Sequence, residues 1–229
     1  MDISSSENPF CKVHKKGMMR FLMVKTAGVR SGIKSGELLR VSSCYRLRHS
    51  WNGAEERGCP REDTEICLSM KEILDALKLS FHILKQDSES ALVLFYAPEL
   101  LKETLKNQET ARTLEKLGYT DPASLEKSLE TLSERCRNGL SHEVGFFIGY
   151  PPKDVIGFLS GKTPEETAGS RKRKGSWRIF GEAEESLRLM ELYRKVERKA
   201  DIILKRYQDL ETCLSEMETI QIKGVFQHV

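Results

Sequence analysis

The chain has 229 residues, 39% hydrophobic and 31% charged, a composition typical of a globular protein with one substantial core. A formal net charge of +3 indicates neither nucleic-acid nor membrane binding, since both usually rely on a concentrated excess of one charge. No stretch reaches the roughly 20 apolar residues that cross a bilayer, and residues 18–24 are too few for the apolar core of a signal peptide. We therefore expect a soluble cytoplasmic protein.

The cysteines do not indicate a metal site. There are 6 of them, scattered along the chain, and in the cytoplasm we expect reduced thiols. Cys44, His49, Cys59 and Cys67 could be arranged as zinc ligands, but the chain has no Cys-x-x-Cys pair and the spacing matches no zinc ribbon or finger. We predict no bound metal, and the sequence identifies no cofactor.

The N-terminal part predicts an irregular start and two strands. Residues 1–17 are polar, so we expect a disordered N-terminus ahead of an α/β domain that runs to residue 181. Two apolar runs, residues 21–26 and 38–44, indicate strands, and a basic, glycine-containing loop with Lys34 joins them. Residues 46–66 are polar and rich in turn residues, which is typical of an exposed insertion.

A helix and a hairpin are predicted next. Residues 80–84 and 91–96 are strand-like runs, and the short polar segment between them favours an antiparallel hairpin. Ahead of them, apolar residues at helical spacing predict an amphipathic helix, namely Met70, Ile73, Leu74 and Leu77.

Two more helices are predicted in the middle of the chain. The first begins at Pro98 and extends to Leu117, where Gly118 ends it. Asp121 and Pro122 form a cap and first-turn pair in front of the second helix. The apolar stripe of this second helix consists of Leu125, Leu129 and Leu132.

Residues 144–159 predict a buried strand that passes directly into a helix. The apolar run 144–148 indicates the strand, and residues 152–159 have a helical pattern that starts at a proline. Residues 161–176 form a polar loop, whose basic run 171–174 we interpret as solvated, and residues 177–180 indicate a further strand. Strands separated by helices predict a mixed α/β sheet flanked by helices, with an α+β arrangement as the alternative.

The C-terminal segment predicts one long amphipathic helix. Residues 182–220 contain no proline or glycine, and apolar residues recur in a 4-3 pattern over about four heptads. At 1.5 Å per residue this helix would be on the order of 55 Å long, so it must project, fold back as a hairpin or pair with another chain. Self-association through residues 186–217 is one hypothesis; a helix lying across its own sheet is the alternative, because Met190, Leu192 and Leu204 widen the apolar face.

The sequence contains neither a complete phosphate loop nor a complete zinc-protease motif, although two segments resemble them in part. The segment from Gly157 to Thr163 has three residues between its glycines where a phosphate loop needs four, and it ends a helical run instead of starting one. His142 and Glu143 begin like a zinc-protease helix, but the second histidine would fall at Phe146. The pair is either a strand-entry histidine with an exposed glutamate or a ligand-binding and proton-transfer pair.

The corner at residues 149–154 is the candidate ligand site. Gly149 would let a ligand approach the backbone, and the two prolines after Tyr150 would direct the amides of Lys153 and Asp154 outward at a positive helix end. Against this, the carboxylate of Asp154 could already satisfy that end. A purely structural corner is the alternative.

The segment His142 to Leu159, together with Ser176 to Gly181, resembles the bacterial family called domain of unknown function 3793. The resemblance covers about residues 20–195 and also includes Gly32, Ile33, Lys34 and Leu38. Thr26 stands where the family usually has a cysteine, and Ser141 where it has a proline. The basic run and the heptad tail look like additions. The resemblance implies a fold and a compartment but no reaction, cofactor or verified site.

Two hypotheses of function follow. In the first, the protein is a non-enzymatic binding or interaction module that uses the corner and the long helix. In the second it is an enzyme or a ligand-binding protein for a small anionic molecule, with Lys34 supplying charge, His142 a proton and the amides after Tyr150 an anion cradle. The second hypothesis requires Lys34, His142 and Tyr150 to meet at one cavity; the full candidate set is Lys34, His142, Glu143, Gly149, Tyr150 and Lys153.

Overall fold

Three apolar runs form a central antiparallel sheet in the computed structural model of the chain, which describes residues 9–42, 74–87, 90–161 and 177–218. Its strands are β1 (Gly36–Ser42), β2 (Ser80–Gln86) and β3 (Ser90–Tyr96). Strand β3 is central and pairs with both neighbours, so that Tyr96 lies opposite Gly36 on one side and Ser80 on the other. The predicted hairpin and the mixed α/β fold are confirmed.

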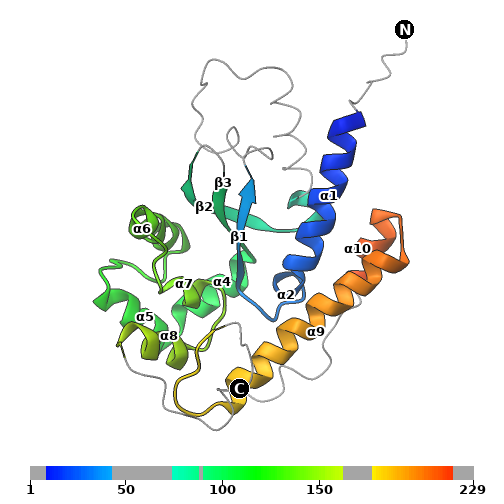
Figure 1. Ribbon diagram of the computed structural model, residues 1–229. Coiled ribbons are helices and arrows are strands. Elements are labelled where there is room, and N and C mark those ends of the chain that lie inside the picture. The colour runs from blue at the N-terminus through cyan, green and yellow to red at the C-terminus, as the bar shows by residue number, and fades with distance from the viewer. Residues whose placement is uncertain (1–8, 43–73, 88–89, 162–176, 219–229) are drawn as a thin grey trace, which may run out of the picture.

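Two layers of helices cover the two faces of this sheet (Figure 1). Because side chains alternate along a strand, Val93 and Phe95 face one layer whereas Leu92 and Leu94 face the other. The first layer consists of α1 (Pro9–Lys25), α2 (Ala27–Arg30), α9 (Glu184–Arg206) and α10 (Leu210–Glu218), with a helical turn at residues 74–77. The second consists of α4 (Pro98–Lys106), α5 (Gln108–Lys116), α6 (Leu125–Cys136), α7 (Val144–Phe147) and α8 (Pro152–Leu159).

The predicted strand at residues 21–26 is wrong, because these residues continue helix α1 to Lys25. Met18, Met19, Leu22 and Met23 are buried, a spacing that places one helical face on the sheet, while Phe21 is 41% exposed. Leu and Met also favour a helix over a strand, which agrees with the helical spacing of these buried residues. The helix begins at Pro9, so residues 9–17, expected to be irregular, are also helical.

The middle helices form where expected, with different boundaries. The predicted helix 98–117 is broken at Asn107, whose extended backbone separates α4 from α5 and whose side chain accepts hydrogen bonds from the first amides of α5. Helix α6 begins at Leu125 with Ser124 as its N-cap, three residues after the predicted Asp121 and Pro122 pair. Leu129 and Leu132 of its predicted apolar stripe are buried.

The C-terminal segment folds back as a hairpin of two helices. Tyr207 adopts an extended conformation that ends α9, and Asp209 starts α10 by accepting a hydrogen bond from the amide of Thr212 at 2.7 Å. Val196, Ala200 and other heptad positions pack into the core together with α1 and β3. The heptad pattern therefore serves an intramolecular core, the second of the three arrangements that the helix length allowed.

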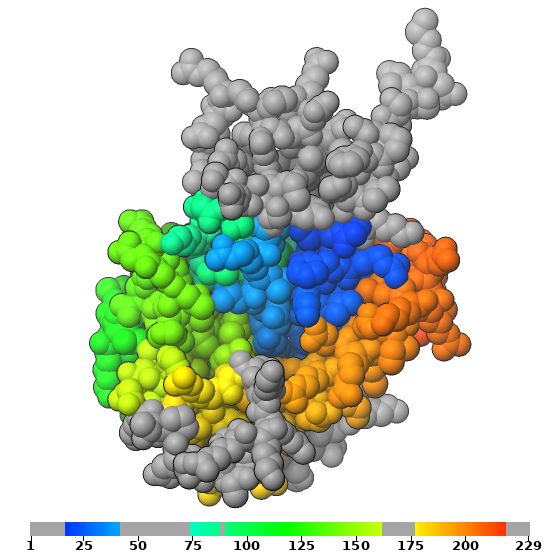
Figure 2. Space-filling view, viewed as in Figure 1, coloured from blue at the N-terminus to red at the C-terminus, as the bar shows by residue number. Residues whose placement is uncertain are grey.

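Several predictions fall outside the described residues: the insertion 46–66, the basic run 171–174 and the cysteine and histidine group around Cys59. Within the part of the chain that the structure describes, no helix has both the length and the apolar character of a bilayer-crossing segment. The same described ranges contain no cluster of three His, Cys, Asp or Glu side chains arranged to hold a metal ion. Figure 2 shows the two helical layers on either side of the light-blue β1.

Candidate functional site

The segment after His142 is a helical turn, so the predicted strand at residues 144–148 is wrong. Helix α7 ends at Phe147, and Gly149, two residues later, has a φ of +77°, the left-handed conformation that glycine adopts without strain. The amide of Tyr150 donates to the carbonyl of Gly145 at 2.9 Å, and the amide of Gly149 donates to the carbonyl of Phe146 at 3.2 Å. This pair of bonds is the Schellman motif that ends many helices. The glycine and tyrosine interpreted as a strand exit are therefore a helix C-terminus.

The loop before β1 is attached directly to this turn. Ser35 is 2% exposed, and its hydroxyl donates to the carbonyl of Phe147 at 3.0 Å. At Gly36, an added Cβ would lie 2.6 Å from the same carbonyl, so the contact is possible only for glycine. The two close contacts bring Lys34 and Glu37 beside the α7 turn, although more than 100 residues separate them in sequence.

Asp154, in the first turn of α8, is the centre of a buried hydrogen-bond network. It is 2% exposed and accepts hydrogen bonds from Lys153 Nζ, Trp177 Nε1, the Phe180 amide and Ser186 Oγ, at 2.6 to 2.8 Å. The Phe180 amide thus bonds to a carboxylate instead of a strand partner, and residues 177–180 form no strand, contrary to the prediction. This network fixes Trp177 beside α8.

Helix α9 is attached to the same region by Tyr193. Its hydroxyl donates to the carbonyl of Gly149 at 2.7 Å. Burial raises the pKa of Tyr193, with smaller contributions from neighbouring Tyr150 and Glu37, so the hydroxyl remains a donor. Segments from β1, α7, α8 and α9 therefore meet around the turn.

A cavity of about 410 Å³ lies at this meeting point. Its lining is mostly apolar and comes from the β1 loop, the α7 turn, α8 and the segment that carries Trp177 and Arg178. Of the six candidate residues, Lys34, His142 and Tyr150 line the cavity, whereas Glu143, Gly149 and Lys153 are outside the lining. The convergence that the ligand-binding hypothesis required is present.

One group of side chains at the cavity is aromatic and carries an ion pair. Tyr150 stacks on Trp177 with ring centroids 4.3 Å apart, and Trp177 lies 6.1 Å from Tyr193. Lys34 Nζ is 5.4 Å from the Tyr193 ring centroid and 2.5 Å from a carboxylate oxygen of Glu37. Burial, with the nearby charge of Glu37, raises the pKa of Tyr150 to about 12, so its hydroxyl stays protonated at neutral pH.

A second group surrounds Phe158. The His142 ring meets the Phe158 ring edge-on at 4.6 Å, and the Arg178 guanidinium lies 5.5 Å from the same ring centroid. Both His142 and Arg178 are exposed, and neither forms an ion pair with any residue in the described ranges. The roles of Arg178 and Trp177 were not predicted, because residues 177–180 were expected to form a strand; their place within the resembling segment Ser176 to Gly181 was the available signal.

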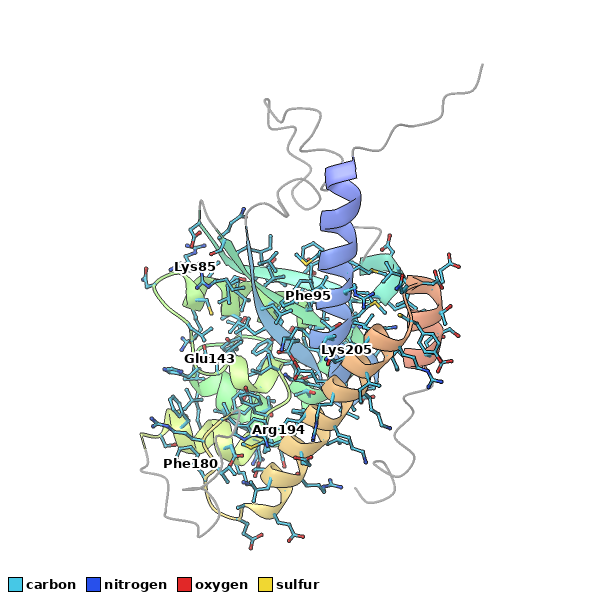
Figure 3. The ribbon with its side chains drawn as sticks, turned by 45° about the vertical axis from the view of Figure 1, so that its right-hand side comes forward. Lys85, Phe95, Glu143, Phe180, Arg194 and Lys205 are labelled. Atoms are coloured by element: carbon cyan, nitrogen blue, oxygen red, sulfur yellow. The ribbon has the colours of Figure 1, made fainter. Side chains whose placement is uncertain are left out.

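Glu143 is a structural residue outside the cavity lining, among the helices of the second layer (Figure 3). It is 1% exposed, contrary to the expected exposed glutamate, and its carboxylate accepts from Arg135 Nε, from Tyr119 Oη at 3.3 Å and from Ser141 Oγ at 2.5 Å. Burial alone would raise the pKa of Glu143, but the hydrogen bonds from Ser141 and Arg135 outweigh it and lower the pKa below the usual value of a glutamate.

Lys153 is also occupied by structural contacts. Its ammonium contacts Asp154, the carbonyl of Phe180 at 3.0 Å and Ser186 Oγ at 2.9 Å. The amide of Asp154, expected to face a ligand, donates to the carbonyl of Pro151 at 2.9 Å. The first turn of α8 contributes Asp154 and Val155 to the lining, but its polar groups are engaged in contacts within the protein.

Residues 22–214 match the family model described as Protein of unknown function (DUF3793). The chain belongs to this family. The match extends through α9 and into α10, so the C-terminal helices, which looked like an addition in the sequence, are part of the DUF3793 region. No curated protein and no solved structure matches the chain.

Proposed function

We propose that this DUF3793 protein is a small-molecule binding protein that holds an anionic ligand in the cavity beside α7 and α8. The observation that carries the proposal is the convergence of Lys34, His142 and Tyr150 with Arg178 on one mostly apolar cavity of about 410 Å³. Small-molecule sites typically have volumes of roughly 300 to 1,000 Å³, an apolar lining and a few polar groups that set orientation.

The charges around the cavity favour an anion. Glu37 is paired with Lys34 at 2.5 Å, and Asp154 is satisfied by Lys153 and three neutral donors. Among the described lining residues, Arg178 is then the formal charge without an opposite partner. A positive group at a partly enclosed, apolar site attracts an anion more strongly than it would in open water.

Binding without catalysis agrees best with the side chains at hand. A catalytic histidine usually needs a nucleophile in reach and a carboxylate that orients its ring. Among the described residues, the ring contact of His142 is with Phe158, and the one buried carboxylate next to it in sequence, Glu143, is bonded elsewhere. The proposed role is thus a binding protein acting in the cytoplasm, and cell fractionation checks the compartment.

A thermal-shift screen tests the proposal directly. Purified protein is heated with phosphorylated metabolites, nucleotides, flavins and aromatic or aliphatic carboxylates, and the screen is repeated on Arg178→Gln and His142→Ala. A ligand at 100 times its dissociation constant stabilises the folded state by about 2.7 kcal/mol. We expect that gain to fall in both variants and to persist in Arg137→Gln, an exposed arginine away from the cavity. If none of these ligands stabilises the protein, the proposal is wrong.

Self-association through residues 186–217 stays a proposal with less support. The seam that the heptads predict is packed inside the chain, with Val196, Ala200 and Leu204 at most 4% exposed. Ile202, which is 62% exposed, is the large apolar side chain that α9 leaves at the surface. Sedimentation of the full chain over a range of concentrations tests the proposal, and a concentration-independent monomer would end it.

A further inference from the structure

We infer that the ligand of this cavity is an amphipathic monoanion, a carboxylate attached to an apolar chain or ring, and not a polyphosphate. The inference rests on the proposed function and narrows it to a ligand class. Three features carry it: the geometry around Phe158, the character of the cavity wall, and the distribution of charge.

The carboxylate would bind beside Phe158. The guanidinium of Arg178 lies 5.5 Å from the Phe158 ring centroid, and this contact with a ring limits the conformations of a long side chain. A guanidinium over a ring face still has its edge N–H groups free, and their planar fork matches the two oxygens of a carboxylate. His142, at 4.6 Å on the same ring, can donate a second hydrogen bond.

The apolar body would lie along the wall of the cavity. Leu38, Val144, Ile148 and Val155 line it from β1, α7 and α8, and the Tyr150 and Trp177 stack closes one side. Val144, Ile148 and Val155 are 5 to 7% exposed, so this wall is anchored in the core of the second layer. Covering such a surface with an apolar group favours binding, because it removes apolar area from water.

A polyphosphate does not fit the charges of the same cavity. Its binding sites usually supply several cations or a series of free backbone amides. Here the ammonium of Lys34 is 2.5 Å from Glu37, and the carboxylates of Glu37 and Asp154 are both part of the lining. Each additional negative charge on the ligand would meet these carboxylates, whereas a single charge is balanced by Arg178 alone.

Fluorescence of Trp177 provides the test. The chain has 2 tryptophans, so Trp51→Phe leaves Trp177, which lines the cavity, as the reporter. This protein is titrated with octanoate, with octanol as its uncharged counterpart, and with pyrophosphate as a polyanion without an apolar body. We expect octanoate to change the Trp177 emission, octanol to bind roughly tenfold more weakly, and pyrophosphate not to compete. Arg178→Gln is expected to weaken octanoate roughly tenfold and to leave octanol unchanged, while Arg137→Gln changes neither.

The outcomes separate the inference from the proposed function. If pyrophosphate binds more tightly than octanoate and Arg178→Gln abolishes this binding, the inference of a monoanionic ligand is wrong, but the cavity still binds an anion. Equal binding of octanoate and octanol would also overturn the inference, because the charge would then not be recognised. If neither anion binds and the thermal-shift screen is blank, both the inference and the proposed function are wrong.

Discussion

The buried carboxylate of Asp154 gives the sharpest prediction of this structure. Asp154→Asn keeps the volume of the side chain but removes its charge and turns one acceptor oxygen into an amide donor. In the native structure Oδ1 accepts from Lys153 Nζ and the Phe180 amide, and Oδ2 accepts from Trp177 Nε1 and Ser186 Oγ. Whichever way the new amide is oriented, at least one of these donors loses its partner.

The better orientation sets the magnitude. An NH₂ group at the Oδ1 position would face Lys153 Nζ and the Phe180 amide, neither of which can accept a hydrogen bond. At the Oδ2 position it faces Ser186, whose hydroxyl can rotate to accept, and Trp177, whose indole nitrogen cannot. The cost is then one unsatisfied indole N–H, about 1 to 3 kcal/mol, plus the weakened contact to the partly exposed Lys153, about 1 kcal/mol. We expect the free energy of unfolding to fall by about 3 kcal/mol.

Urea unfolding followed by Trp177 fluorescence in the Trp51→Phe background measures this loss. The same experiment reports on the indole itself, whose emission should shift to longer wavelength once Asp154 no longer holds it. Asp121→Asn is the matched control, because its ion pair with Lys127 is exposed and contributes at most about 1 kcal/mol. If the free energy of unfolding of Asp154→Asn lies within about 0.5 kcal/mol of that of its parent, the hydrogen-bond network of Asp154 does not stabilise the fold as argued.

Three further predictions concern stability. Gly157→Ala should destabilise the protein by about 1 to 3 kcal/mol, because the new Cβ would lie 2.4 Å from the ring of Phe180. Gly17→Ala, at an exposed position of α1 with open space around it, should stabilise the protein by about 0.5 to 1 kcal/mol. Urea unfolding of both variants measures the two changes. Glu143 has a lowered pKa in the folded state, so its contribution is complete above pH 4.5 and is lost as the pH falls through its folded-state value. Glu143→Gln should therefore lower the free energy of unfolding by about 3 kcal/mol at pH 7 and by progressively less below pH 4.5. Urea titrations that give the same decrease at pH 7 and below pH 4.5 would contradict this. Ser35→Ala should cost about 1 kcal/mol in thermal unfolding, since it removes the hydrogen bond that attaches the β1 loop to α7, and an unchanged melting temperature would show that the bond is not needed.

The hairpin of β2 and β3 could be predicted because its signal is local. Strands β2 and β3 contain apolar and aromatic residues over single short runs, and the polar join between them fixes their antiparallel pairing. Helix α8 was predicted with its boundaries at residues 152 and 159, because proline at the first helical position is an equally local signal. No information from distant parts of the chain was needed for these elements.

The errors arose where local signals are ambiguous. The five apolar residues 144–148 suit a buried strand and a buried helical turn equally well, since both of their faces are covered. Gly149 and Tyr150 end either element, and the Schellman bonds that decide between them are backbone contacts invisible in side-chain patterns. The break at Tyr207 was missed for a related reason: neither glycine nor proline marks it, and the cap at Asp209 lies within an uninterrupted heptad pattern.

The candidate site was predicted in part. Lys34, His142 and Tyr150 were chosen for their chemistry and their position in the family motif, and all three line the cavity. Arg178 and Glu37 were missed, because their role depends on which segments the fold brings together. The Ser35 contact to α7 supplies one of these segments and the Asp154 network supplies the other.

Two buried carboxylates, Glu143 and Asp154, hold in place the segments that form the cavity wall, and their oxygens are occupied by hydrogen bonds within the protein. Glu143 fixes the start of the α7 turn through Arg135 and Ser141, and Asp154 fixes the start of α8 through donors from two other segments. Each is at most 2% exposed and is fully engaged in hydrogen bonds. The motif from 142 to 159 therefore supplies much of the cavity wall, while the unpaired charge among the described lining residues comes from Arg178. Substitutions at the carboxylates should consequently lower stability and affinity together, whereas Arg178→Gln should lower affinity alone.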